Sequence, residues 1–236
     1  PLPGIDPGAL ADIFSQQSSG ILGMFDMFSG GALSRMTIFA LNIMPYITAS
    51  IIMQLMTAIV PSLEALKKDG EAGRKMINQY TRYLTVLLAT VQGYGIAVGL
   101  ESATGVVDDP GLFFRVTTVV TLVGGTLFLM WLGEQITSRG VGNGISLIIF
   151  AGIVANLPTA LAGTLELGRT GALSSLLIVL LLVMATAVIA FIVFIERSVR
   201  KILVQYPKRQ HGNKVFGGDQ SFLPLKINVP GVIPPI

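Results

Sequence analysis

Five long apolar runs dominate the pattern of hydrophobic and polar positions along the chain, and short polar stretches separate them. A helix needs about 20 apolar residues to cross a bilayer core, and these runs are close to that length. The pattern therefore predicts an all-α fold, a polytopic α-helical membrane protein with five full transmembrane helices. The predicted helices cover residues 36–60, 83–100, 116–132, 145–162 and 173–195, all without an internal charge.

Proline, asparagine and glycine mark irregular positions within these runs. Pro45 lies near the middle of the first run, where it would free the carbonyl group of Leu41 and permit a bend. Asn156 and Pro158 interrupt the fourth run, so we expect that helix to end early or to bend. In the second run, the GxxxG spacing of residues 95–99 would let another helix approach closely.

Residues 1–35 differ in kind from the five runs. The stretch from Ile21 to Arg35 mixes Met, Phe and Leu with Asp26, Ser29 and three glycines, and its apolar part is too short to span a bilayer. It predicts either an amphipathic helix on the outer leaflet or a half-inserted helix, which protein or water must surround at membrane depth.

Composition supports a membrane protein and argues against disulfides, metal sites and catalytic residues. Of the 236 residues, 52% are hydrophobic and 12% are charged, whereas soluble domains are about 25% charged. Cysteine is absent and the single histidine, His211, lies in a basic loop, so we expect no disulfide, no metal site and no cofactor. The predicted spans offer only amides and hydroxyls, so we also expect no catalytic residue.

The glycine-rich string from Gly140 to Gly144 resembles a phosphate loop only superficially. It lacks the lysine and hydroxyl residue that end such a loop, and no strand precedes it. It predicts instead that one helix stops and the next begins, with Asn143 as the N-cap.

Cations are distributed unevenly among the connecting segments. Of the 16 lysines and arginines, 13 lie in residues 61–82, 133–144 and 196–228. Under the positive-inside rule these segments are cytoplasmic, and residues 1–35, 101–115 and 163–172 are external. Because the chain then begins outside, we expect one more span upstream. Residues 229–236 are expected to begin a further span.

Residues 196–228 form the most distinctive polar region. RKILVQY partly alternates apolar and polar residues and QHGN supplies a turn, so the segment predicts a basic hairpin. Its cations suit an anionic partner, either nucleic acid or an acidic protein, or they are simply the positive-inside flank.

Isoleucine pairs recur at the same spacing in two of the apolar runs. Ile43 and Ile47 are four residues apart, as are Ile145 and Ile149, so each pair shares one helix face. Such pairs either line a narrow apolar constriction that blocks ions or simply face lipid, and the spacing alone leaves both open.

Longer motifs identify a known family. In order along nearly the whole chain they resemble bacterial SecY, the family of pore-forming subunits of the Sec protein-conducting channel. The resemblance implies an N-terminal half of such a subunit, whose five spans are transmembrane helices two to six and whose last residues begin helix seven. The motifs are SGGALSR, TIFALNIMPYITASII, KKDGEAGRKMINQYTRY, FLMWLGEQITSRGVGNGISLIIFAGIVA, FIERSVRK and LPLKINVPGVIP.

The same resemblance implies roles for particular residues. A short plug half-helix within residues 1–35 would contain Ile21, Met24, Phe25, Met27, Phe28, Ser29, Gly30 and Gly31. A ring of apolar side chains at the pore waist would contain Ile43, Ile47, Ile145, Ile149 and Ile236. Thr48 and Gln54 would belong to the lateral gate. Contacts to the ribosome and the SecA motor would come from Arg197, Arg200, Lys201, Lys208, Arg209 and Lys214.

The family implies a function without chemistry of its own. The intact protein would pass unfolded polypeptide across the bacterial cytoplasmic (inner) membrane and release transmembrane segments sideways into the lipid bilayer. Its implied partners are SecE, SecG, SecA, the ribosome, signal sequences and nascent polypeptides. Two alternatives stay open: a secondary transporter for small solutes, whose ionisable groups would lie elsewhere, and a scaffold or insertase for membrane proteins.

Overall fold

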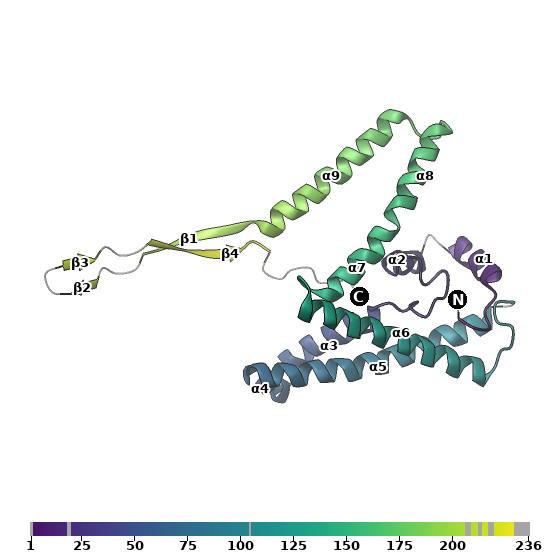
Figure 1. The fold of residues 1–236 in the computed structure, drawn as a ribbon, viewed down its shortest axis with the longest axis horizontal. Helices are drawn as coiled ribbons and strands as arrows, with labels where there is room; N and C mark the ends of the chain where they lie inside the picture. The colour runs from purple at the N-terminus through teal and green to yellow at the C-terminus, as the bar shows by residue number, and fades with distance from the viewer. Residues whose placement is uncertain are drawn as a thin grey trace. The chain divides into compact units, whose positions relative to one another are not determined.

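The computed structural model describes residues 2–17, 20–103, 105–205, 209–211, 214–216 and 220–228 of the chain. The chain divides into two compact units, Pro1–Ala160 and Leu161–Ile236. The first unit is helical in its described part, and the second combines helices with strands. In the first unit lie α1 (Pro7–Gln17), α2 (Ile21–Phe28), α3 (Met44–Ile59), α4 (Pro61–Lys68), α5 (Glu71–Ser102), α6 (Leu112–Arg139) and α7 (Gly144–Ala155) (Figure 1).

Helices α5 and α6 form the antiparallel pair on which the first unit is built (Figure 1). Their contact is close because the buried face of α5 carries small residues, with Ala89, Gly93 and Ala97 at successive turns. A Cβ atom added at Gly93 would lie 3.6 Å from the Cα of Val119 on α6. Helix α3 packs against α5, and α7 packs against α6.

Ion pairs join α5 and α6 near both ends. At one end Arg82 donates from Nε and a terminal nitrogen to the two carboxylate oxygens of Glu134, at 2.9 and 2.7 Å. At the other end Arg115 lies 2.6 Å from Glu101, which also accepts a 3.0 Å bond from the Gly111 amide. The pair is therefore fixed against sliding along its length.

The first predicted helix begins later than its apolar run. Residues 38–43 form turns and the helix starts at Met44, so Pro45 occupies the first helical turn. The expected bend at Pro45 is therefore wrong. Proline is well accommodated where it lies, because amides in the first turn have no helical acceptor and the proline φ already suits a helix. Asn42 just upstream has a left-handed φ of 49°, which no helix tolerates.

Residues 61–82, expected as a loop between spans, are largely helical. Helix α4 follows α3 after a bend of 99°, and α5 begins at Glu71, twelve residues before its apolar run. The polar residues here are good helix formers, and the pairs Glu64 with Lys68 and Glu71 with Lys75 have the spacing that supports a helix. Hydropathy located only the apolar part of this helix.

The fourth run is interrupted where asparagine and proline indicated. Helix α7 ends at Ala155, Asn156 forms a turn, and α8 (Leu157–Arg169) continues with Pro158 in its first turn. Taken together, α7 and α8 are a candidate span of 26 residues. The helix thus continues past the interruption.

The segment before α2 is tied to the loop between α5 and α6. The amide of Asp6 donates to the carbonyl of Val106 at 2.9 Å, and Ile5 forms an antiparallel bridge with Val107. Leu2 and Leu10 are buried in the core that these segments share. Two segments that the charge pattern assigned to the same side of the membrane therefore contact each other.

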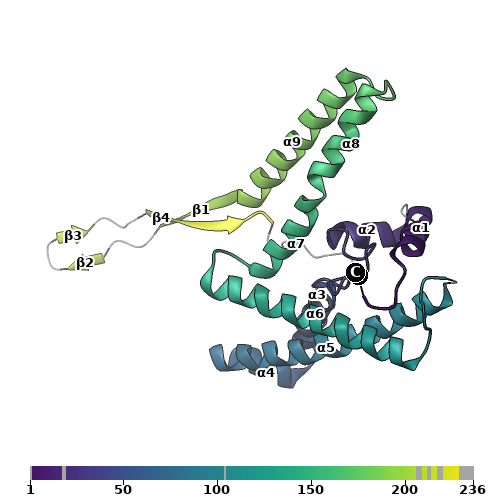
Figure 2. The ribbon, with the colours of Figure 1, turned by 45° about the vertical axis from the view of Figure 1, so that its right-hand side comes forward.

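The second unit contains the end of α8, helix α9 (Ser175–Arg197) and the strands. Ser174 caps α9, its side chain accepting a 3.3 Å bond from the Leu177 amide. Strands β1 (Val199–Gln205) and β4 (Gln220–Lys226) pair antiparallel, as do β2 (Arg209–His211) and β3 (Lys214–Phe216) (Figure 2). The strand pairing of the predicted hairpin is confirmed, whereas Gly212 and Asn213 of its expected turn lie outside the described residues.

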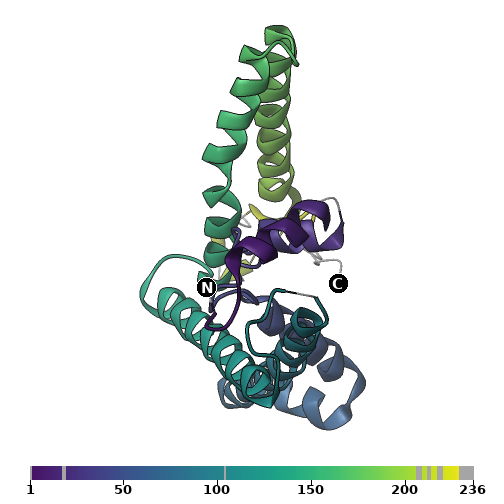
Figure 3. The ribbon, with the colours of Figure 1, turned by 90° about the vertical axis from the view of Figure 1, so that its right-hand side faces the viewer.

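The described residues contain four helices that are long and apolar enough to cross a membrane, or up to five if the bent pair of α3 and α4 counts as one span. They are α5, α6, α7 with α8, and α9; Figure 3 shows the connection from α8 to α9. The protein is a polytopic α-helical membrane protein, and the described residues also include α1 and α2, which are too short to span a bilayer core.

Candidate functional site

The short helix α2 ends in a tightly bonded turn. Gly30 and Gly31 have left-handed φ angles of 68° and 79°, which stop the helix. The backbone carbonyl of Asp26 accepts from the Gly31 amide at 3.0 Å, and its carboxylate accepts from the Ser34 amide at 2.8 Å. Ser29 donates its hydroxyl to the same Asp26 carbonyl at 2.9 Å. The end of α2 is therefore rigid within itself.

This end of α2 lies against α7 and against the turn before α3. The side-chain amide of Asn42 donates to the Phe28 carbonyl at 3.1 Å. A Cβ atom built on Gly152 of α7 would lie 2.8 Å from the same carbonyl oxygen, and one on Gly30 would lie 3.1 Å from the Gly152 oxygen. Figure 2 shows α2 beside α7. Backbone thus meets backbone at this contact.

The four described isoleucines of the expected ring lie on the elements that hold α2. Ile43, next to Asn42, is 1% exposed at the start of α3, and Ile47 is half-buried one turn later. Ile145 and Ile149 are half-buried on α7, where a Cβ atom added at Gly133 of α6 would lie 3.0 Å from Ile145. Other apolar side chains of α7, such as Leu147 and Phe150, are exposed. Ile236 lies outside the described residues.

The remaining expected plug and gate residues have mixed environments. On α2, Met24 and Met27 are exposed, whereas Phe28 and Ser29 are half-buried; the side chains of Ile21 and Phe25 lie outside the description. Thr48 is half-buried and bonds the Met44 carbonyl of its own helix at 3.1 Å, and Gln54 is exposed. Their separation of six residues places them about 120° apart around a helix with about 100° per residue. They do not share one face.

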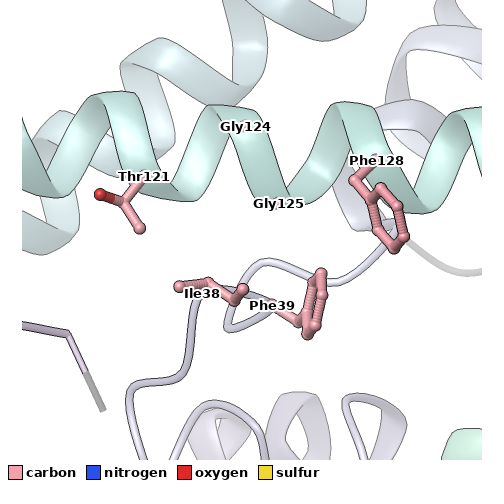
Figure 4. Close-up of a pocket in the computed structure, with 6 residues that line it drawn as sticks. All are labelled: Ile38, Phe39, Thr121, Gly124, Gly125 and Phe128. Atoms are coloured by element: carbon pink, nitrogen blue, oxygen red, sulfur yellow. The ribbon is translucent and has the colours of Figure 1, made fainter.

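A shallow apolar groove lies where the segment before α3 crosses α6. The Ile38 carbonyl touches the position that a Cβ atom of Gly125 would occupy, so only glycine permits this crossing. Phe39 and Phe128 pack beside it with ring centroids 6.1 Å apart and ring planes tilted by 31° (Figure 4). The crossing fixes the segment that carries Asn42 and Ile43. The groove has a volume of about 380 Å³ and is lined by Ile38, Phe39, Thr121, Gly124, Gly125 and Phe128.

The expected partner-binding cations lie on the second unit. Arg197 ends α9, and Arg200 and Lys201 are exposed on β1 opposite Leu225 and Pro224 of β4. None of these three takes part in an ion pair among the described residues. Arg209 and Lys214 lie on the backbones of β2 and β3, and Lys208 lies outside the described part.

The polar groups of the α2 site are backbone carbonyls, the side-chain amide of Asn42, and the Asp26 carboxylate and Ser29 hydroxyl, which bond within their own segment. Within the described ranges, no three His, Cys, Asp or Glu residues lie close enough to hold a metal ion. Sequence reasoning missed Asn42, Gly125 and Gly152, because each acts on a segment far away along the chain. It expected close packing at Gly95 and Gly99 instead, which have no heavy atom of the described chain within 4 Å of an added Cβ.

Comparisons with known proteins assign the sequence to a family. The SecY family model matches residues 37–236. Protein translocase subunit SecY of Rickettsia bellii is 60% identical over 240 residues, and that of Escherichia coli is 56% identical over 239 residues. The alignments cover 100% of this chain but 55% and 54% of the relatives. The chain thus spans about half the length of the curated relatives that it matches.

Solved structures show the same fold at low identity. A protein-conducting channel superposes with a TM-score of 0.54 and 18% identity, covering 93% of this chain and 51% of the other. Sec61 in the canine ribosome–channel complex from the endoplasmic reticulum gives a TM-score of 0.51 and 17% identity, with 83% and 47% coverage. At these identities the likeness concerns the fold alone.

Proposed function

This chain belongs to the SecY family, and from that premise we propose that the intact protein is the central subunit of a protein translocation channel. It passes unfolded secretory polypeptides across the membrane and releases transmembrane segments laterally into lipid. The shared name of the relatives, protein translocase subunit, supports this function over small-solute transport. The chain spans about half the length of those relatives, so the proposal concerns the intact protein.

The observation that carries the proposal is the position of α2 against α7 and the turn before α3. A helix of eight residues cannot span a bilayer core, which takes about 20. It is held by the elements that carry both isoleucine pairs, namely the start of α3 and α7. We infer that α2 is the plug and that Ile43, Ile47, Ile145 and Ile149 form part of the ring, together with Ile236.

An apolar ring suits a moving peptide because it binds no sequence tightly. Branched apolar side chains part around a polypeptide and exclude water when they close, so ions do not follow. The plug covers the ring on the external side when no polypeptide is present. Energy for movement comes from other proteins, the proposed partners SecA and the ribosome.

Other parts of the chain are proposed to meet partners and lipid. The basic hairpin of β1 to β4 contacts the ribosome and SecA. Helices α3 and α5 form the wall that admits signal sequences, with Thr48 and Gln54 on different faces of α3. SecE and SecG complete the channel in the bacterial inner membrane. The composition and the candidate spans support a multi-pass membrane protein.

The test of the ring is resting ion conductance. Replacing Ile43, Ile47, Ile145 and Ile149 by Ser in the full-length protein should raise the conductance of idle channels in a planar bilayer, because hydroxyls stabilise water in the constriction. The matched control is Leu147→Ser, which changes an exposed side chain of α7. Resting conductance equal to that of the control would refute the ring assignment.

A further inference from the structure

The Phe28 carbonyl, at the last residue of α2, is contacted from two sides. Carbonyls at a helix C-terminus lack an intrahelical donor, so they need a partner from elsewhere. Here the donor is the side-chain amide of Asn42, at 3.1 Å. Asn42 is only 8% exposed, and a shielded hydrogen bond meets less competition from water than one on the surface.

The backbone conformation of Asn42 allows its side-chain hydrogen bond to be tested separately from the turn. Its φ of 49° is left-handed, a conformation that asparagine and glycine adopt more readily than other residues. Glycine at this position would keep the turn before α3 and remove only the donor. Asp would keep the shape and place an acceptor against the Phe28 carbonyl.

Gly152 provides the second contact. A Cβ atom at this position would lie 2.8 Å from the Phe28 oxygen and 3.6 Å from the Gly30 nitrogen. Both neighbours are backbone atoms in a turn that the Asp26 hydrogen bonds hold rigid. The turn cannot yield locally, so even one methyl group must push α2 away from α7.

Among the side chains of α2 that the structure describes, the two methionines add little to hold the helix in place. An isolated helix of eight residues is unstable in water, because helices below about 12 residues are marginal. Met24 is 63% exposed and Met27 is 47% exposed. The bonds made by Asp26 run within the segment itself, to Ser29, Gly31 and Ser34. They would therefore travel with the segment when it moves.

We propose that Asn42 and Gly152 form a latch that holds the plug helix α2 in its seat. The inference rests on the proposed function and adds how the plug is coupled to the ring. Asn42 adjoins Ile43, and Gly152 lies one turn after Ile149 on α7. A polypeptide that pushes α3 and α7 apart at the ring also moves Asn42 away from Gly152. The Phe28 carbonyl then cannot keep both contacts, so α2 is released in the same movement that opens the ring.

The test measures α2 directly, apart from transport. In the full-length protein in nanodiscs, Asn42→Gly and Gly152→Ala should each speed hydrogen–deuterium exchange of the amides in residues 21–31. A factor of about five to ten is expected for Asn42→Gly, which is the equivalent of one buried hydrogen bond. The matched control is Gly99→Ala on α5, which has open space at the added methyl group and should leave exchange unchanged.

Resting conductance of the same variants separates the latch from the proposed function. Faster exchange with higher conductance supports both the latch and the sealing role of α2. Faster exchange with unchanged conductance supports the latch and refutes the sealing role. Unchanged exchange in Asn42→Gly overturns the latch whatever the conductance. If Gly152→Ala does not insert into the membrane, Asn42→Gly alone decides the matter, because glycine preserves the turn.

Discussion

At the scale of single residues, glycine backbone contacts set how closely the helices of the first unit approach. Gly125 lies under the Ile38 carbonyl, Gly144 lies against Gly133, and Gly152 lies against Phe28. Each contact joins segments that are distant in the sequence or separated by a turn. A single sequence shows which residues are glycine but not which of them another backbone crosses. From sequence alone, Gly95 and Gly99 were therefore as good candidates for close packing as Gly125.

Gly125→Ala should destabilise the protein markedly. The added methyl group would overlap the Ile38 carbonyl and force the segment before α3 away from α6, at a cost of about 1–3 kcal/mol for overpacking. Thermal unfolding in detergent would measure the loss. Gly124→Ala is the matched control, because a Cβ atom added at Gly124 would lie in open space. Equal melting temperatures for the two variants would contradict the crossing at Gly125.

Local signals at residue scale were readable from sequence. Asn143 was expected to cap the helix after the glycine string, and its side chain accepts a 3.1 Å bond from the Ile145 amide. Both the cap and the helix that it starts lie within three residues, so no tertiary information was needed.

Asn143→Ala should lower the stability of α7 by about 1 kcal/mol, the usual value of an N-cap. Asn143→Ser should restore most of it, because serine also accepts from the first-turn amides. Thermal unfolding of both variants would show the difference. The cap would have no energetic role if Ala and Ser gave the same melting temperature.

At the scale of elements, the apolar runs located the spans but not their ends. Helix α5 extends twelve residues before its apolar run because charged residues continue it. Helix α3 starts eight residues after its run begins because Asn42 takes a left-handed φ and Pro45 favours a first turn. Hydropathy reports burial in lipid, whereas helix ends depend on backbone conformation and capping.

The ion pair of Glu101 with Arg115 should contribute to stability more than a surface pair. The side chain of Glu101 is 9% exposed and lies 2.6 Å from Arg115, whereas Glu71 and Lys75 are largely exposed at 3.9 Å. Glu101→Gln should therefore lower the melting temperature measurably, and Glu71→Gln should leave it nearly unchanged. If both substitutions had the same effect, the joint between α5 and α6 would not depend on this pair.

The basic hairpin should bind its partners through charge. Reversing Lys208, Arg209 and Lys214 to Glu should weaken binding of ribosomes or SecA to membranes that contain the protein, most clearly at low salt, where screening is weak. Reversal of Lys75, an exposed cation at the start of α5, is the control. Unaltered affinity at low salt would exclude these three cations as the contact.

At the scale of the whole molecule, the apolar surface exceeds what this chain can cover. Apart from Ile178, the side chains of α9 are largely exposed although the helix is apolar on every side. A helix of this kind needs lipid or further protein around it. The composition therefore predicted the class of protein, and the motifs predicted the family.

The charge distribution predicts which side each loop faces. The chain has no cysteine, so single cysteines can report position without background. Lys67→Cys should react with a membrane-impermeant maleimide only from the cytoplasmic side, and Asp108→Cys only from the outside. Labelling of both from one side would overturn the orientation.

The ion pairs at both ends of α5 and α6 have a mechanical consequence. These two helices form a fixed pair, and α3 packs against α5 while α7 packs against α6. Under the proposed function, a passing polypeptide would displace α3 and α7 relative to this fixed pair. Because α5 and α6 keep their places, we expect α3 and α7 to return to the same positions once the polypeptide has left.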